Sequence, residues 1–190
     1  LAVAVEPHQV PWLRDAADGG EGSFLDTEAV RARVDSPTYL AGLFSGESCA
    51  IVNPAKLVFE LARACAEKGV RIYEGTPVRS LSRDGSRIEA RTWASSITAK
   101  RVVLATNVFP SLVRRNRLYT VPVYDYVLAT EPLTGEQLSR IGWSGREGIS
   151  DTGNQFHYYR LSADNRILWG GYDAAYYYGR KVDPRREDRP

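Results

Sequence analysis

The sequence predicts a protein of mixed structure, spanning the fold classes α+β and α/β. Its first and last parts contain short apolar runs separated by turn signals, which is typical of a largely antiparallel sheet. The region 51–107 between them reads in order as helix, strand, meander and strand, as expected of part of an α/β domain. A hydrophobic content of 43% is sufficient for a buried core in a chain of 190 residues.

The N-terminal part is expected to supply strands and a short helix to the strand-rich region. Asp26 is a favourable N-cap residue, because its carboxylate accepts hydrogen bonds from free backbone N–H groups of the first turn. Residues 11–13 and the glycine-rich stretch 18–22 read as loop. The elements expected here are a strand end over 1–5, a helix over 27–34 and a strand over 39–44.

The helix of the middle region carries the clearest local signals. Asn53 is a strong N-cap, and Pro54 suits the first helical position, where its missing N–H is not needed. Gly69 lies where a left-handed C-cap residue is required. Cys65 is expected to be a buried apolar residue. It belongs to one apolar face that repeats at helical spacing, whose members are Leu57, Val58, Leu61, Ala62 and Cys65.

Strands are expected directly after this helix. Asp84 and Gly85 form the strongest short hairpin signal of the region. The run 102–105 is apolar without alternation, which indicates a central strand of a parallel sheet covered on both faces. The strands expected here span 70–72, 77–81, 87–93 and 100–105.

The C-terminal part reads as strand-rich again. Thr134 and Gln137 fit a capping box for a short helix that ends at Gly142. Alternation along a predicted hairpin strand places His157 and Tyr159 on the same face. The strands expected here span 119–130, 156–161 and 166–170, and a charged tail begins at residue 179.

Composition argues against several classes of protein. The net charge of +2 disfavours nucleic acid as a partner. No apolar run approaches the ~20 residues of a membrane span, and no signal peptide is visible at Leu1. Cys49 and Cys65 form neither a disulfide framework nor a metal-ligand set, so no metal site is predicted, and a cytoplasmic location is expected. Without a Ser/His/Asp constellation, no catalytic residue is assigned.

A resemblance to a known family rests on six segments, which are residues 53–57, 69–78, 102–107, 124–132, 158–161 and 166–171. In this order they resemble the FAD-dependent amine and D-amino-acid oxidases, the superfamily of glycine oxidase, sarcosine oxidase and D-amino-acid dehydrogenase. The branch most similar is that of γ-glutamylputrescine oxidoreductases. The family's Gly-rich phosphate loop is absent, because no G-x-G-x-x-G motif lies between a strand and a helix.

The resemblance implies the central fragment of a flavoprotein, in which a strand-rich, largely antiparallel substrate domain joins part of an FAD-binding α/β domain. The start at Leu1 and the lack of any Met also suggest a fragment, which by itself is expected to be inactive. The implied substrate domain comprises 1–50 and 108–178, the partial FAD-binding domain 51–107 and the charged tail 179–190.

The resemblance also implies residues that contact FAD. The backbone of Val78 would bind the adenine end of the cofactor. The alternative is that Val78 is only a core residue of a strand. Ala105, Thr106 and Asn107 end the apolar run, where small residues approach the phosphate region at the carboxyl end of a strand. The alternative is a plain transition from strand to loop.

On the substrate side, the resemblance turns the face of His157 and Tyr159 toward the flavin, so both are candidates to line an amine pocket. Asp173 is implied as a pocket residue whose carboxylate would pair with a second ammonium group of a polyamine-like substrate. A structural role is the alternative for each of the three, since a lone histidine is more often structural than catalytic.

The function implied by the resemblance is oxidation of a C–N bond of an amine or amino acid to an imine, with FAD as the electron acceptor. The alternative is a non-catalytic module that binds a ligand or partner and does not hold FAD by itself. The small-molecule amine or amino acid is the expected partner, and the sequence leaves the oligomeric state open.

Overall fold

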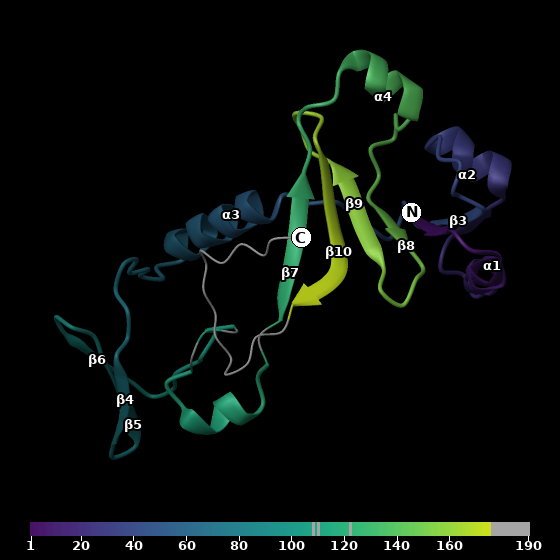
Figure 1. The fold of residues 1–190 in the computed structure, drawn as a ribbon. Helices are drawn as coiled ribbons and strands as arrows, with labels where there is room; N and C mark the ends of the chain where they lie inside the picture. The colour runs from purple at the N-terminus through teal and green to yellow at the C-terminus, as the bar shows by residue number, and fades with distance from the viewer. Residues whose placement is uncertain (108, 110, 122, 176–190) are drawn as a thin grey trace. The chain divides into compact units, whose positions relative to one another are not determined.

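The computed structural model describes residues 1–107, 109, 111–121 and 123–175. These residues form two compact units (Figure 1). Unit 1 comprises Leu1–Val52 and Tyr124–Ala175, and unit 2 comprises Asn53–Val123 among the described residues. The identification of these units as substrate domain and partial FAD-binding domain stays a prediction.

A seven-stranded sheet forms the centre of unit 1, in the order β2-β3-β1-β8-β9-β10-β7. The β1–β8 pair is parallel and the other described pairs are antiparallel, so the expected mixed fold with a largely antiparallel sheet is confirmed. The strands are β1 (Ala2–Ala4), β2 (Ser23–Leu25), β3 (Ala41–Phe44), β7 (Tyr124–Ala129), β8 (Ile149–Asp151), β9 (His157–Leu161) and β10 (Ile167–Ala175).

Helices α2 and α4 of unit 1 have the capping residues that the sequence predicts. In α2 (Thr27–Arg33), the Asp26 carboxylate accepts from the backbone N–H of Ala29 at 2.9 Å. In α4 (Gly135–Ile141), Thr134 and Gln137 form the expected capping box, and Gly142 closes the helix at φ 66°. These local predictions are confirmed.

The loop predicted over residues 11–13 is wrong, because they lie in α1 (Val10–Asp18), which follows the short helix η1 (Pro7–Gln9). Pro11 falls in the first turn of α1, where the missing N–H of proline is tolerated. Leu13 is buried against Ala4 and Leu43, so tertiary packing stabilises a helix that turn-like local composition obscures.

The core of unit 1 lies on both faces of the sheet, because successive strand residues point to opposite sides. Val3 is buried in one cluster with α2, Trp143 and the inner residues of β8 and β9. Its neighbour Ala4 is buried in the other cluster, under α1. The first cluster consists of Val3, Val30, Val34, Tyr39, Trp143, Ile149, Tyr159 and Leu161.

An aromatic contact joins the segment between α2 and β3 to strand β9. The hydroxyl groups of Tyr39 and Tyr159 lie 2.6 Å apart, and both side chains are buried. The ring of Tyr159 stacks on the ring of Trp169 with centroids 4.2 Å apart. The ring of Trp143 packs edge-on against the Tyr159 ring, with centroids 6.1 Å apart. Burial, the largest cause, raises the pKa of both Tyr39 and Tyr159 above the ordinary tyrosine value.

The described residues of unit 2 form a helix, a three-stranded antiparallel meander and a short 3₁₀ helix. Asn53 caps α3 by accepting from the backbone N–H of Lys56 at 3.1 Å, and Gly69 follows at φ 85°, as predicted. Gly85 forms the expected hairpin turn at φ 57°. The elements are α3 (Pro54–Glu67), β4 (Ser80–Asp84), β5 (Arg87–Arg91), β6 (Ser96–Ala99) and η2 (Arg114–Leu118).

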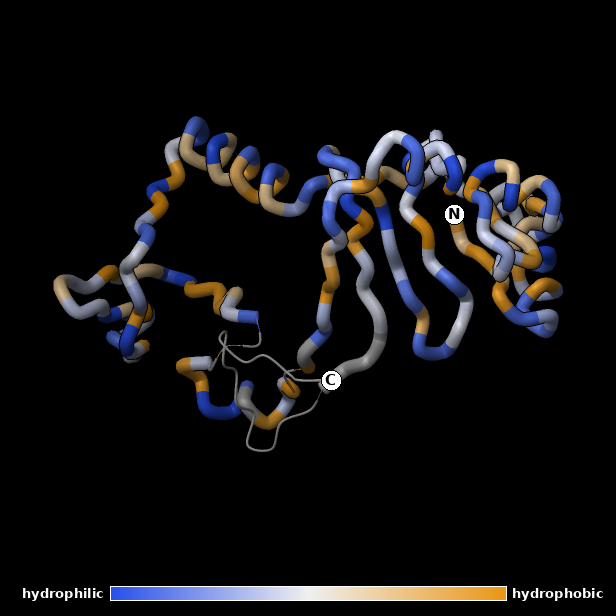
Figure 2. Tube along the Cα trace, turned by 45° about the horizontal axis from the view of Figure 1, so that its top comes forward, coloured by the Kyte–Doolittle hydropathy of each residue, from blue (hydrophilic) through white to orange (hydrophobic). Residues whose placement is uncertain are grey.

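Several predictions for unit 2 are wrong. Residues 70–72 and 102–105 do not form strands, and Val103 is 87% exposed. A strand of a parallel sheet requires neighbours for its backbone hydrogen bonds, and the described part of unit 2 supplies only the meander. The apolar face of α3, whose residues appear as orange patches in Figure 2, is likewise not buried, and Cys65 is exposed.

Other strand limits also differ from the prediction. The strand expected at 77–81 lies at 80–84, and the third meander strand lies at 96–99, before the strand expected at 100–105. The long strand expected at 119–130 is confined to 124–129. The short strands β2 and β8 fall where none is predicted, because three residues are too few to show alternation. Among the described helices, none combines the length and the apolar character needed to cross a bilayer. The cytoplasmic location stays a prediction.

We expect Gly42→Ala to lower the free energy of unfolding by about 1–3 kcal/mol, the usual result of overpacking a core. A Cβ atom at Gly42 would lie 2.9 Å from Val30 Cγ2 and 3.1 Å from Leu1 Cδ1. Gly135→Ala is the matched control, because no atom lies within 4 Å of a Cβ there. Urea unfolding measures both variants. Equal stability of the two proteins would contradict the close packing of β3 against α2.

We expect alkaline pH to weaken the fold through the Tyr39–Tyr159 pair. The pair makes its full contribution to the free energy of unfolding below the ordinary tyrosine pKa of about 10. Above that pH the unfolded chain loses tyrosine protons that the native state retains, so the free energy of unfolding falls. Urea midpoints between about pH 8 and 11 should fall less steeply in the Tyr39→Phe/Tyr159→Phe double variant. Identical slopes would show that the pair does not titrate abnormally.

Candidate functional site

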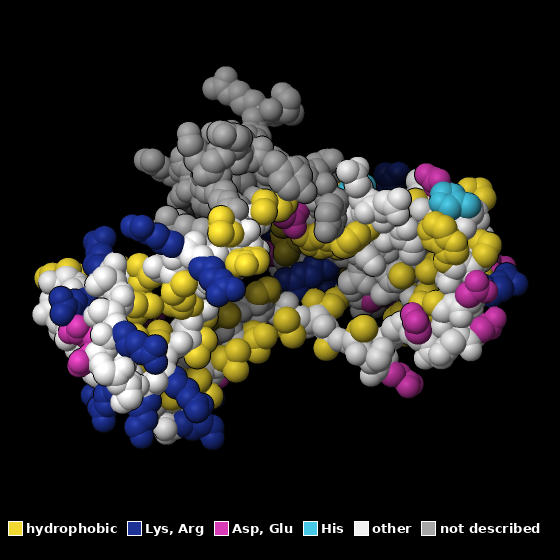
Figure 3. Space-filling view, turned by 90° about the horizontal axis from the view of Figure 1, so that it is seen from below, with side chains coloured by type: hydrophobic (Ala, Val, Ile, Leu, Met, Phe, Trp, Pro, Cys, Tyr) yellow, Lys and Arg dark blue, Asp and Glu magenta, His cyan; other side chains and the backbone are white. Residues whose placement is uncertain are grey.

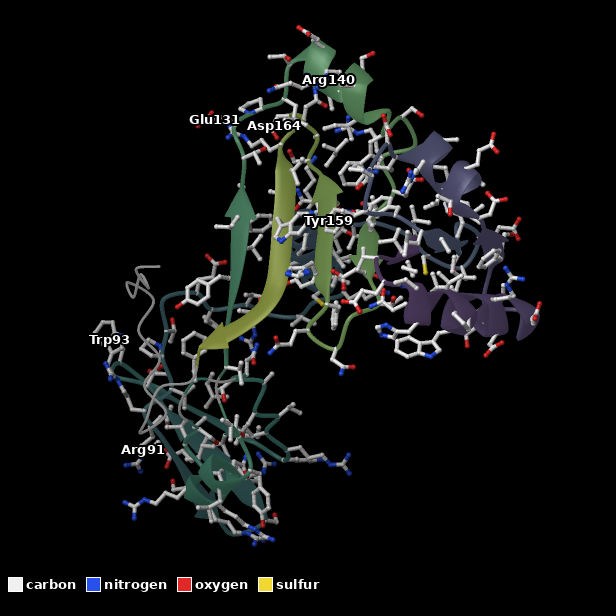
Figure 4. All side chains as sticks on the ribbon, turned by 45° about the vertical axis from the view of Figure 1, so that its right-hand side comes forward. Arg91, Trp93, Glu131, Arg140, Tyr159 and Asp164 are labelled. Atoms are coloured by element: carbon white, nitrogen blue, oxygen red, sulfur yellow. The ribbon has the colours of Figure 1, made fainter. Side chains whose placement is uncertain are left out.

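The candidate substrate residues lie on the hairpin of β9 and β10. Register pairs His157 with Gly171 and Tyr159 with Trp169, so all four residues belong to one face of the sheet. At Tyr159, which Figure 4 labels beside β9, this face is buried in the core. The side chain of His157 is 42% exposed, at the margin of the same face.

A carboxylate holds the imidazole of His157. Asp151 Oδ2 lies 2.8 Å from His157 Nδ1 and accepts from the His157 backbone N–H at 3.1 Å. Asp151 Oδ1 accepts from the backbone N–H of Gly153 at 3.0 Å. Because an ionised carboxylate only accepts hydrogen bonds, it holds the ring proton on Nδ1 and leaves the lone pair on Nε2. The side chain of Asp151 is 12% exposed, so the pair is partly shielded from water.

Glycine at position 171 makes room for this ring. A Cβ atom there would lie 2.8 Å from His157 Cδ2, closer than real Cβ contacts permit. The imidazole also lies 5.5 Å from the Trp169 ring, measured between centroids. His157 is therefore fixed by a carboxylate, a cross-strand glycine and an indole, while its side chain stays 42% exposed.

A second polar pair lies on the opposite face of the same strands. The hydroxyl of Tyr158 donates to Asp125 Oδ2 on β7 at 2.5 Å, reaching across β10. A Cβ atom on Gly170 would lie 2.3 Å from the Tyr158 ring, so glycine is required where the ring crosses the strand. The hydrogen bond to Asp125, followed by burial, raises the pKa of the Tyr158 hydroxyl.

The three predicted substrate residues have different surroundings, although His157 and Tyr159 share one face of the sheet. His157 is half-exposed, whereas Tyr159 is 9% exposed and its hydroxyl is engaged by Tyr39. Asp173 lies in β10, within the register shift opposite β7, and its side chain lies outside the described part of the chain. Their roles in binding substrate stay predictions.

The predicted cofactor residues lie in unit 2 outside regular structure. Val78 is 41% exposed, and the next residue, Arg79, donates its backbone N–H to Arg91 at 2.7 Å, which joins the segment to the meander. The exposed residues Ala105 and Thr106 lead to a turn in which Asn107 adopts φ 50°. Their contacts with FAD stay a prediction, and the described residues contain no Gly-rich phosphate loop.

Sequence reasoning missed Asp151, Asp125 and the roles of Gly170 and Gly171. A local signal existed for Asp151, because an aspartate two residues before a glycine is typical of an Asx turn. No local signal existed for Asp125, since its partner Tyr158 is 33 residues away in the chain.

Charge is segregated between the two units. Unit 1 contains 7 Lys and Arg against 15 Asp and Glu, and residues 53–123 of unit 2 contain 13 against 5. Figure 3 shows the basic side chains gathered over unit 2 and most acidic ones over unit 1. Among the described residues, His, Cys, Asp and Glu do not gather in any group of three or more that would hold a metal ion.

The family model and the curated relatives that match this chain are all oxidoreductases. The model of the DAO family, "FAD dependent oxidoreductase", matches residues 1–189. A probable oxidoreductase OrdL of Haemophilus influenzae is 31% identical over 150 residues, which cover 76% of this chain and 34% of that protein. The gamma-glutamylputrescine oxidoreductase of Escherichia coli is 30% identical over 183 residues, covering 90% of this chain and 41% of that protein.

Solved structures share the fold at low sequence identity. Glycine oxidase from Geobacillus kaustophilus superposes with a TM-score of 0.68 at 19% identity, covering 96% of this chain and 49% of that one. L-proline dehydrogenase from P. horikoshii gives a TM-score of 0.69 at 16% identity, covering 96% and 50%. The chain spans 34% to 41% of the curated relatives it matches. It belongs to the DAO family of FAD-dependent oxidoreductases, in which FAD is the expected cofactor of the full-length protein.

Proposed function

We propose that the full-length protein oxidises a C–N bond of an amine or amino acid to an imine, which water then hydrolyses. FAD, when bound, supplies the acceptor for the hydride that leaves the substrate carbon. What supports the proposal most is the Asp151–His157 pair, a positioned imidazole on a sheet whose family uses FAD. The names of its relatives include glycine, L-proline and gamma-glutamylputrescine, and each of these compounds contains an amino nitrogen.

His157 has a specific task in this proposal. An ammonium group has no lone pair, so the substrate nitrogen must lose a proton before the carbon can release a hydride and form C=N. Nε2 of His157 accepts that proton, because its lone pair is available while Nδ1 is held by Asp151. Asp151 is a positioning residue that holds the tautomer and the ring orientation. The indole of Trp169 provides an apolar wall beside the ring.

The cofactor contacts are part of the same proposal. The exposed backbone at Val78 would bind the adenine end of FAD, and the small residues Ala105 and Thr106 would allow its phosphates to approach. Asn107 would hold the turn that ends this segment, since asparagine tolerates its positive φ. Tyr159 supports the site from the core, and Asp173 is retained as a candidate for binding a second ammonium group.

We expect the purified full-length protein to be yellow and to contain FAD. Anaerobic addition of a substrate amine should bleach the flavin absorption band, because two electrons pass from the C–N bond to the cofactor. Admission of oxygen or an artificial acceptor should restore the band and release the carbonyl product. A colourless protein that does not take up added FAD, yet binds amines in calorimetry, would support a non-catalytic binding module instead.

We expect His157→Gln to lower kcat/KM by about 10²-fold, the usual range for loss of one general base. His8→Gln is the matched control. His8 also pairs with a carboxylate, Glu6 at 3.2 Å, but its side chain is 59% exposed.

The matching experiment on Asp151→Asn separates positioning from structure. The variant should retain FAD and its unfolding midpoint but show a reduced kcat, with partial recovery in Asp151→Glu. Unchanged steady-state kinetics in both His157→Gln and Asp151→Asn would remove the pair from the reaction.

A further inference from the structure

Two apolar side chains lie beside His157 on its own face of the sheet. Trp169 on β10 pairs with Tyr159 on β9 and with Leu128 on β7, and paired residues of neighbouring strands point to the same side. That side is the face of His157, because His157 pairs with Gly171, two residues after Trp169. We call Trp169 and Leu128 the apolar shelf.

The indole of Trp169 is held in one orientation. The Tyr159 ring stacks on it with centroids 4.2 Å apart and an angle of 8° between the planes. Tyr159 is buried, and its hydroxyl lies 2.6 Å from the hydroxyl of Tyr39. The stack therefore ties the indole to the core of unit 1 and covers one of its two faces.

The rest of the apolar shelf is exposed. Trp169 is 38% exposed and Leu128 is 68% exposed. Strand β10 lies between β9 and β7, and Tyr159 covers the indole from the β9 side, so the exposed part of the indole lies toward β7 and Leu128. An apolar surface that is already fixed loses little conformational freedom when a ligand binds, so it suits a hydrocarbon group.

The spacing between the apolar shelf and His157 limits the size of that group. Successive residues on one face of a strand are about 6.7 Å apart. The imidazole of His157 and the indole of Trp169 accordingly lie 5.5 Å apart between centroids. A ligand whose nitrogen is at the imidazole therefore crosses the indole with roughly four to five carbon atoms of an extended chain.

We propose that the apolar shelf determines substrate specificity, by binding an unbranched hydrocarbon segment that begins at the carbon of the reacting C–N bond. This inference rests on the proposed function, because it places the substrate nitrogen at His157. Trp169 contacts the first carbons of the segment and Leu128 the last ones. The substrate class is then an amine with an apolar segment of about four to five carbons. Glycine, which has no such segment, is disfavoured.

Calorimetric titration of the full-length protein with unbranched alkylamines, from ethylamine to hexylamine, tests the apolar shelf. Any bound FAD is reduced beforehand, so that bound amines cannot react. The Kd should fall about two- to fourfold with each added methylene as far as pentylamine, since each methylene leaves water. It should then level off, because a longer chain extends past Leu128.

Leu128→Ser tests the apolar shelf at an exposed position, where the fold tolerates a polar residue. The variant should lower the gain in affinity to less than about 1.5-fold per methylene, because the end of the chain loses its apolar contact. Val127→Ser is the matched control. Val127 is the preceding residue of β7 and is 57% exposed, but it pairs with Gly170 on the opposite face, so this variant should behave as the parent protein does.

Trp169 is tested by two substitutions. Trp169→Ala should also remove the dependence on chain length, whereas Trp169→Phe should retain it, because a phenyl ring can still stack on Tyr159. Trp12→Ala is the control, since Trp12 is 53% exposed and lies 5.1 Å from another imidazole, that of His8. Equal dependence on chain length in Leu128→Ser and Val127→Ser would overturn the proposal. A parent protein that binds no alkylamine, or binds all of them equally, would also overturn it.

The failure of this proposal and the failure of the proposed oxidation are distinguishable. If amines bleach the flavin band but the Kd of the parent protein does not depend on chain length, the oxidation stands and the apolar shelf is wrong. If the Kd depends on chain length and Leu128→Ser removes that dependence, but no amine bleaches the flavin, the apolar shelf stands as a binding site and the proposed oxidation is wrong.

Discussion

The adjacent glycines of β10 are the constraint on which both faces of the candidate site depend. Gly170 allows the ring of Tyr158 to cross the strand toward Asp125, and Gly171 allows the imidazole of His157 to lie on the other face. Because strand residues alternate, a pair of consecutive glycines opens one position on each side of the sheet. Glycine in a strand interior normally weakens the strand, so its presence twice in succession is explained by close approach of neighbouring side chains.

Strand β9 holds the candidate site in place, because it contributes residues both to the buried core and to the site. Tyr159 and Leu161 are buried in the cluster beneath α2, and the Tyr159 hydroxyl is held by Tyr39. His157 and Tyr158 belong to the same strand, directly before Tyr159. The packing of the buried residues of β9 therefore fixes the backbone positions of His157 and Tyr158. Side chains that bind a ligand are more accurately placed on a packed strand than on a loop. Tyr159 therefore influences the site through its position in the core.

Local signals in the sequence were sufficient to predict the helix caps and the hairpin turn at Gly85. Asp26, Asn53 and the Thr134–Gln137 capping box act on backbone groups within three or four residues, so no distant contact is needed to predict them. The polar pairs could not be found in this way. Asp125 meets Tyr158 only because β10 lies between their strands, and that order depends on the whole sheet. The apolar runs of unit 2 show the converse, since a strand pattern forms no strand without neighbouring strands to pair with.

Net charge over the whole chain is a poor guide to the field that a ligand meets. The value of +2 conceals an excess of acidic residues in unit 1 and an excess of basic residues in unit 2. Charges farther apart than the Debye length, about 10 Å at 0.1 M salt, are largely screened, so the two excesses act locally. An acidic unit favours ammonium groups, and a basic unit favours the diphosphate of a dinucleotide. The proposals for the amine and for FAD thus assign each ligand to the unit of opposite charge.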